Sequence, residues 1–120
     1  MEAQKLDKTI RAKAENLGVT QIELRFQGGS DEGYLHVEVV HPEVTWQTRD
    51  DPDKQQLRTE VLQLAEDVEK WAWEVYSYSG AGDGSDYGDD IIYNLKEGVV
   101  ETSEWYQEVK YSDPVKMEMS

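Results

Sequence analysis

Twice along this chain, a stretch with the apolar spacing of an amphipathic helix is followed by two runs in which apolar and polar residues alternate. The helical spacing covers residues 4–17 and returns at Leu57, from which it continues for about six turns. Alternation at every second residue is typical of a strand with one buried face. The alternating runs are 22–26 and 35–39 in the first half of the chain, and 91–95 and 99–111 in the second.

The order helix, strand, strand, helix, strand, strand predicts an α+β domain of two layers. Glycine-containing connections join the strands of each pair, so each pair is expected to form an antiparallel hairpin. The simplest packing is a four-stranded antiparallel sheet with both helices on one face. A chain of 120 residues has the usual size of one domain, which we assign to residues 1–112. Residues 113–120 contain Pro114 and are expected to fray.

Several residues mark the expected ends of these elements. Gly18 is placed to end the first helix in the left-handed conformation. Asp51 is a predicted N-cap of the second helix, with Pro52 as its first residue. Trp46 is predicted to anchor the preceding loop to the core. Residues 77–90 hold four glycines and four aspartates and are expected to form a polar loop.

The charge of the chain is strongly negative, because 26 Asp and Glu residues stand against 12 Lys and Arg, a formal net charge of -14. Seventeen of the acids, with six of the bases, follow residue 50. Such a field repels nucleic acid and anionic membranes and attracts basic surfaces. We therefore expect no direct binding to nucleic acid or to a membrane. The expected partner is a basic protein surface, of the kind found on nucleic-acid-binding proteins.

The composition also argues against several classes of function. The chain has no cysteine, which excludes disulfides and thiolate metal sites. No apolar run has the length of a signal peptide or a membrane span, so a cytoplasmic location is expected. His36 and His41 are the only histidines, and no pair of nucleophile and base can be nominated from spacing. We predict a protein that is not an enzyme and has no cofactor; its oligomeric state stays open.

Twelve residues are candidates for contact with the partner. On the strands, carboxylates interleave with tyrosine on the parity opposite the apolar set, although any antiparallel sheet with one solvated face shows such alternation. On the second helix, Trp73 lies off the apolar stripe beside acids and is a possible anchor, since tryptophan is enriched where binding energy concentrates. The candidates are Glu23, Glu38, Glu104, Tyr106 and Glu108 on strands, Glu66, Glu69 and Trp73 on the helix, and Asp83, Asp86, Asp89 and Asp90 in the glycine-rich segment.

Two other interpretations of the chain remain open. The glycine-rich segments around Gly28 and Gly84 could form a module that binds a cation or a small ligand, since hard cations take several carboxylate oxygens. An EF-hand beginning at Asp83 does not fit, because Asn94 stands where the bidentate glutamate is needed. In the plainest interpretation the chain is an accessory domain whose acidity serves solubility alone.

The run from Phe26 to Leu35 resembles the F-D-G-x-G-D-S-G-x-I signature of an uncharacterised family of small acidic bacterial proteins, a domain of unknown function, with matches at Phe26, Gly28, Asp31 and Gly33. Residues 83–89 are similar to that family's D-G-x-Y-G-E segment, with one extra residue. The likeness spans most of residues 10–112. It implies the same architecture and a prokaryotic or phage setting, and it implies no activity.

Charge, alternation and the lack of catalytic motifs together predict a non-enzymatic acidic inhibitor that occupies a basic surface of another protein. In its most specific form this protein is a nucleic-acid mimic that blocks a nucleic-acid-handling machine, as expected of a phage or mobile-element anti-defence protein.

Overall fold

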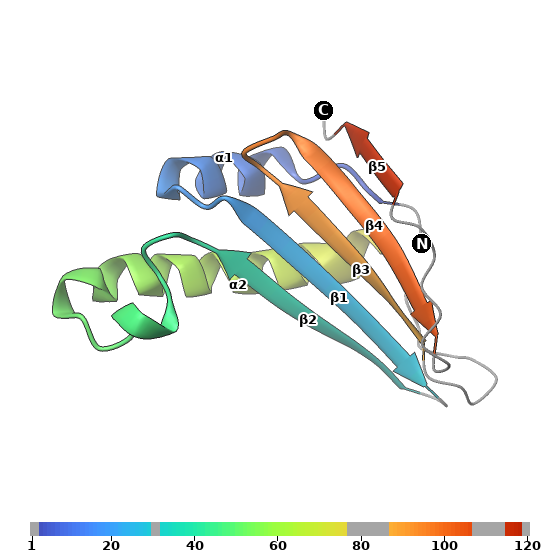
Figure 1. The fold of residues 1–120 in the computed structure, drawn as a ribbon, viewed down its shortest axis with the longest axis horizontal. Coiled ribbons are helices and arrows are strands. Elements are labelled where there is room, and N and C mark those ends of the chain that lie inside the picture. The colour runs from blue at the N-terminus through green and yellow to red at the C-terminus, as the bar shows by residue number, and fades with distance from the viewer. Residues whose placement is uncertain (1–2, 30–31, 77–86, 107–114, 119–120) are drawn as a thin grey trace.

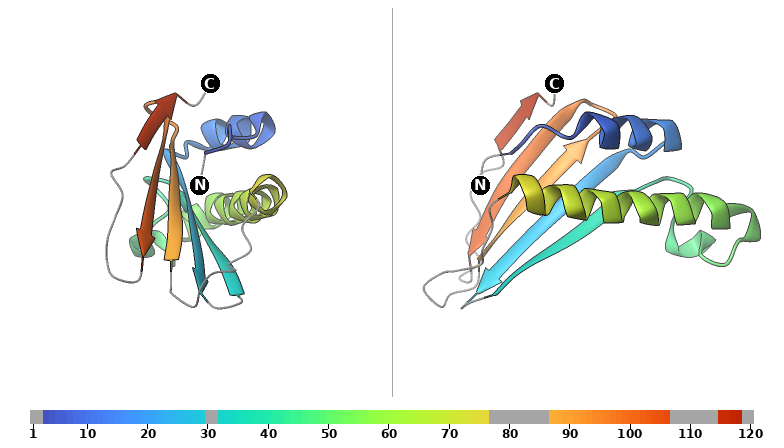
Figure 2. Two further views of the ribbon diagram at one scale, coloured as in Figure 1. Left: turned by 90° about the vertical axis from the view of Figure 1, so that its right-hand side faces the viewer. Right: turned by 180° about the vertical axis from the view of Figure 1, so that it is seen from behind.

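The computed structural model describes residues 3–29, 32–76, 87–106 and 115–118, in which two helices cover one face of an antiparallel sheet (Figures 1 and 2). The helix order and the α+β two-layer architecture are those predicted from the sequence. The strands lie in the order β2-β1-β3-β4-β5 across the sheet. The elements are α1 (Lys8–Leu17), β1 (Gln21–Gly29), β2 (Glu32–Val40), the 3-10 turns η1 (Trp46–Thr48) and η2 (Pro52–Lys54), α2 (Gln55–Val75), β3 (Tyr87–Asn94), β4 (Val99–Tyr106) and β5 (Val115–Glu118).

Two element assignments made from the sequence are wrong. Val115–Glu118 forms β5, a fifth strand that pairs with β4, within the tail that was expected to fray. Tyr87–Asp90 belongs to β3, although its glycine and aspartates predicted a loop. In both segments the local preference is weak for a strand, and pairing with neighbouring strands overrides it. Gly88, for example, lies between Gln27 of β1 and Trp105 of β4.

Helix α1 is held at both ends by its own sequence. The Asp7 side chain accepts hydrogen bonds from the backbone N–H groups of Thr9 and Ile10, at 3.0 and 3.1 Å, so the helix begins later than residue 4. Gly18 ends it in the left-handed conformation, with φ of 88°, as predicted. The segment before the helix is not helical, and it places Ala3 and Leu6 in the core.

Asp51 caps the 3-10 turn η2 rather than α2, because its side chain accepts a hydrogen bond from the backbone N–H of Asp53. Helix α2 begins at Gln55, after Lys54, which makes no side-chain cap hydrogen bond, so the predicted start of this helix at Pro52 is wrong. Its buried residues recur at helical spacing and face the sheet. The helix ends at Val75, and the extended conformation of Tyr76 turns that ring into the core. None of the described helices is both long and apolar enough to cross a membrane. The core comprises Ala3, Leu6, Ile10, Ala14, Val19, Ile22, Leu24, Phe26, Leu64, Val68, Ala72, Tyr76, Ile91, Tyr93 and Val100.

A ring of three hydrogen bonds joins the N-terminal segment to α2 and β3. The Tyr93 hydroxyl donates to the Gln4 carbonyl oxygen at 2.6 Å, because a carbonyl can only accept. The Tyr76 hydroxyl, 2.5 Å from that of Tyr93, must then donate to it. The Gln4 N–H closes the ring by donating to the Tyr76 oxygen at 2.7 Å. Burial raises the pKa of both phenols above their usual value.

The loop between β2 and α2 is fastened by polar groups, and Trp46, predicted to anchor it, is 83% exposed. His41 is buried, and its Nε2 donates to the Leu17 carbonyl oxygen at 2.6 Å. Its Nδ1 accepts from the Glu43 N–H at 3.0 Å. Both ring nitrogens are therefore used, and they tie this loop to the end of α1. The side chain of Arg58 adds a hydrogen bond to the Thr45 carbonyl.

Gly18→Ala should destabilise the fold more than Gly98→Ala does. Both glycines have positive φ, which costs a residue with a Cβ about 1–2 kcal/mol. A Cβ at Gly18 would also lie 3.2 Å from Nε2 of His41, a ring that its two hydrogen bonds hold in place, whereas nothing lies within 4 Å of one at Gly98. Urea unfolding of the two variants measures the difference. Equal losses of unfolding free energy in the two variants would show that the His41 ring can move aside to accommodate the added Cβ.

Tyr93→Phe should lower stability at neutral pH by about 1–3 kcal/mol, because it leaves the Tyr76 hydroxyl and the Gln4 carbonyl without their partner. The variant should also lose less unfolding free energy than the wild type as the pH is raised into the alkaline range. Phenols whose pKa is raised on folding contribute stability that is fully present below the unfolded value of 10.0 and is lost as the pH rises beyond it. Urea unfolding between neutral pH and pH about 11 tests this.

Candidate binding surfaces

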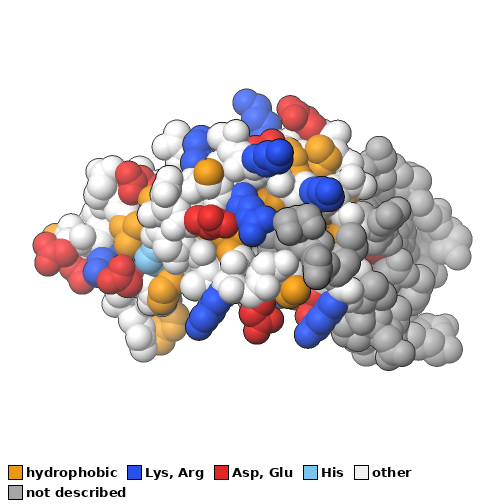
Figure 3. All heavy atoms as spheres, turned by 90° about the horizontal axis from the view of Figure 1, so that it is seen from above, with side chains coloured by type: hydrophobic (Ala, Val, Ile, Leu, Met, Phe, Trp, Pro, Cys, Tyr) orange, Lys and Arg blue, Asp and Glu red, His pale blue; other side chains and the backbone are white. Residues whose placement is uncertain are grey.

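Charge is unevenly divided between the two helices. The segment from residue 3 to the end of α1 carries four bases, at 5, 8, 11 and 13, and two acids, at 7 and 15. Helix α2 carries five acids, at 60, 66, 67, 69 and 74, and two bases, at 58 and 70. Lys and Arg side chains are prominent on the face seen from above, the side on which α1 and β5 lie (Figure 3). A basic partner would therefore approach α2 in preference to α1.

One exposed side of α2 combines apolar and acidic side chains. Leu62, Glu66, Glu69 and Trp73 follow one another at spacings of three or four residues and so lie along one side of the helix. We call these four residues the α2 stripe. Leu62 is 58% exposed and Trp73 is 41% exposed. The stripe thus has an apolar side chain at each end and two carboxylates between them.

The C-terminal three residues of the stripe border a shallow hollow of about 400 Å³. Its lining residues are Glu66, Glu69 and Trp73 from the stripe, together with Asp67 and Lys70. Trp73 packs its ring edge-to-face on Phe26, with the ring centres 6.0 Å apart. The core therefore holds the indole in place, and the exposed part of the side chain is available to a partner. Three of the predicted contact residues are brought together here: Glu66, Glu69 and Trp73.

The sheet face opposite the helices is less available than predicted, because its charges are partly paired. Glu23 is only 9% exposed, and Arg25 contacts it at 2.9 Å. Lys116 lies 3.7 Å from Glu101. Glu38 is exposed and lies directly across from Glu23 on the neighbouring strand. Of the two predicted contact residues on β1 and β2, Glu38 is thus accessible and Glu23 is engaged within the protein.

The predicted parity of β4 is wrong. Glu104 and Tyr106 share the parity of Val100, which is buried in the core, whereas Glu101 and Ser103 alternate with it. The ladder pairs Glu104 with Asp89 and Tyr106 with Tyr87. The prediction rested on Trp105, Val109 and Tyr111, which share the odd parity of the run 99–111, whereas Val100 has the even parity. The side chains at 104 and 106, and Glu108 as a whole, lie outside the described residues.

Of the four aspartates predicted as contacts in the glycine-rich segment, the two that the structure describes do not share a face. Asp89 and Asp90 are adjacent in β3 and so point to opposite faces of the sheet. Asp89, 9% exposed, pairs with Phe26 in the ladder, and Asp90 with Arg25. Asp83 and Asp86 lie outside the described residues. Among the described side chains, no group of three His, Asp or Glu residues could hold a metal ion.

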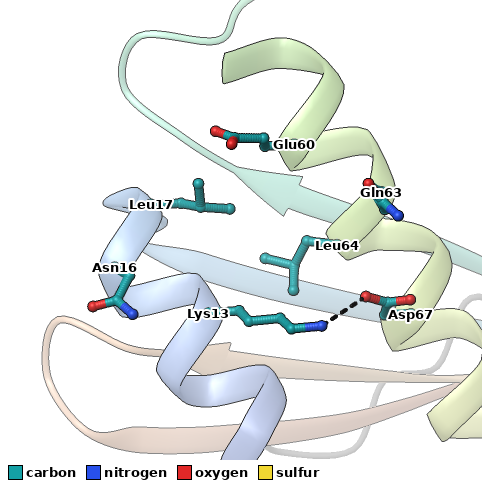
Figure 4. A pocket seen from close by; sticks show the side chains of 7 residues that line it. All are labelled: Lys13, Asn16, Leu17, Glu60, Gln63, Leu64 and Asp67. Atoms are coloured by element: carbon teal, nitrogen blue, oxygen red, sulfur yellow. Dashed lines mark hydrogen bonds and ion pairs between the residues drawn. The ribbon is translucent and has the colours of Figure 1, made fainter. Parts of the chain in front are cut away.

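A groove of about 330 Å³ between α1 and α2 was not anticipated from the sequence (Figure 4). Leu17 and Leu64 lie between the helices, and Lys13 reaches across to Asp67, with Nζ 3.5 Å from the carboxylate. Polar side chains from both helices complete the lining. Lys13 and Asp67 are 54 residues apart, so no local pattern could have indicated that they meet. The lining residues are Lys13, Asn16, Leu17, Glu60, Gln63, Leu64 and Asp67.

Comparisons with protein families, with characterised proteins and with solved structures returned no match to this chain. The resemblance of residues 10–112 to an uncharacterised acidic family therefore stays a prediction. Any function must be argued from the surfaces themselves.

Arg25→Gln should destabilise the fold by about 1–2 kcal/mol, since it leaves the largely buried carboxylate of Glu23 without its cation. Arg25→Gln combined with Glu23→Gln should recover most of that loss, because no charge is then left unpaired. Arg49→Gln, which breaks an exposed pair with Asp50, is the control and should change little. Chemical unfolding of the four proteins gives the comparison. A double variant as unstable as Arg25→Gln would mean that Glu23 is not paired in this way.

Proposed function

We propose that this chain is a non-enzymatic binding protein that occupies a basic surface of another protein through the α2 stripe. The observation that carries the proposal is the arrangement of the stripe, in which Leu62 and Trp73 are exposed at the ends and Glu66 and Glu69 lie between them. An apolar anchor beside charges of one sign gives a partner both binding energy and electrostatic selection.

Two features support α2 over the other surfaces. The open sheet face has cations interspersed with its acids, at Arg25 and Lys116, and the α1 side is basic. On α2 the acids outnumber the bases by five to two, and the stripe itself contains no base. Among the surfaces that the structure describes, long-range attraction of a basic partner would therefore be strongest toward α2.

The specific form of this proposal is mimicry of nucleic acid, in which the partner's basic surface is one that normally binds DNA or RNA. The overall charge of -14 supports it, and so does the prokaryotic or phage setting implied by the family resemblance. Such a partner would be met in the cytoplasm, and blocking it would be an anti-defence activity. Mimicry requires that DNA and this protein compete for one site on the partner.

Glu66→Lys combined with Glu69→Lys should abolish binding to basic partners. Asp50→Lys with Glu97→Lys makes the same change in net charge at exposed sites outside the α2 stripe and should leave most of the binding intact. The measurement is mass spectrometry of the proteins retained from a bacterial lysate by each immobilised variant, at low and physiological salt. Leu62→Ser should weaken binding about tenfold, and it avoids disturbing the contact between Trp73 and Phe26.

Retained proteins that are neutral or acidic, or equal losses in the two charge-matched variants, would contradict the proposal. Mimicry is tested separately, with a captured partner and duplex DNA. Displacement of the partner by DNA supports mimicry. A complex that DNA does not disturb would leave the protein a binder of basic surfaces and refute the mimic.

A further inference from the structure

The two edges of the sheet are protected to different degrees. The edge strand β5 has only four residues and includes Lys116. The other edge strand, β2, has nine residues, and it contains neither proline nor lysine. Its register with β1 runs from Val40 to Glu32 without a bulge. Short length, lysine, proline and bulges are the usual means by which an edge avoids pairing with another strand, and β2 has none of them.

The register shows which main-chain groups of β2 point away from the sheet. The Leu95 N–H donates to the Thr20 carbonyl at 3.0 Å, so even-numbered residues of β1 bond to β3 and odd-numbered ones to β2. The residues of β2 that bond to β1 are then even-numbered. Val40 agrees with this assignment, because its carbonyl oxygen points toward β1 and accepts a hydrogen bond from the Thr20 N–H at 3.0 Å. The outward groups belong to Leu35, Val37 and Val39. Within the described part of the chain they have no hydrogen-bond partner.

We propose that β2 pairs with β2 of a second copy of this chain, antiparallel about a twofold axis at Val37, so that two sheets become one. With the axis there, the outward groups of Val37 bond to Val37 of the second copy. Those of Leu35 bond to Val39 of the second copy, and those of Val39 to its Leu35. About six hydrogen bonds would form. An interface of this kind is closed, because both copies use the same strand and neither β2 remains free for a third copy.

The side chains of β2 select this register. On the open face, Glu38 comes opposite His36 of the second copy, and the same pair forms again across the axis. On the helix-covered face, Leu35 comes opposite Val39. Moving the axis to His36 would put the two histidines opposite each other, and moving it to Glu38 would put two carboxylates opposite each other, which is destabilising. Only the axis at Val37 pairs the carboxylate with the imidazole on both sides.

Val37→Pro tests the pairing with little damage to the monomer. Proline removes an N–H that points to solvent, a position at which an edge strand tolerates it. We expect wild-type protein to sediment as a dimer at a concentration between micromolar and millimolar, and Val37→Pro to stay monomeric with an unchanged circular dichroism spectrum. The matched control is Lys116→Pro, because the same alternation carried across the sheet makes Lys116 an outward residue of β5. This variant should dimerise like wild type.

A second pair of variants tests the register and does not depend on proline. His36→Glu places two carboxylates opposite each other on each side of the axis and should raise the dissociation constant of the dimer at least tenfold, by about 1.4 kcal/mol. Adding Glu38→Lys should restore dimerisation. A wild-type chain that stays monomeric at millimolar concentration overturns the proposal. So does a dimer that survives Val37→Pro, or one that Lys116→Pro disrupts equally.

Discussion

The burial of β1 between β2 and β3 is the constraint on which the rest of the structure depends. Ile22, Leu24 and Phe26 are fully buried under the helices. Strand β1 pairs with β2 along its whole length and with β3 along all but its last residue. Because the second hairpin adds to β1 and not to β2, Tyr93 comes opposite Ile22 in the ladder. That position brings its hydroxyl to Tyr76 and Gln4 and fixes the N-terminal segment. The same topology leaves β2 at an edge.

The division of charge between the helices follows from how each is packed. Both helices bury one apolar side on the sheet, and each is free to carry charge on the other. Lys13 and Asp67 meet where the helices face each other, so the basic and acidic elements also attract at their contact. This attraction is modest, because both side chains are largely exposed. The separation of charge therefore contributes little to folding, and its larger effect would be on the choice of the proposed partner.

The sequence predicted the elements well because alternation, helical spacing and end signals are local. Gly18 and Asp51 each act through their own backbone conformation or hydrogen bonds. The order of strands in the sheet is not a local property, and neither is β5, whose four residues form a strand only by pairing with β4. Trp46 was misassigned because its size predicted burial, while polar groups fasten that loop. The predicted contact residues on α2 share a surface because helical spacing is regular. Those on β4 were assigned to the wrong face because the alternation alone does not show whether the parity of Val100 or that of Trp105 faces the core.

The two proposals reinforce each other through symmetry. A twofold axis that relates two edge strands in one continuous sheet is perpendicular to that sheet, so both copies of α2 would lie on the same side of it. The dimer would then present two α2 stripes to one partner surface or to two neighbouring ones. Binding at the first stripe would raise the effective concentration of the second, and the joint affinity could exceed that of one stripe by about a hundredfold without any new contact. If both proposals hold, an exposed surface of only four residues on each copy would be sufficient for recognition, and the unprotected edge of β2 would favour the proposed binding through α2.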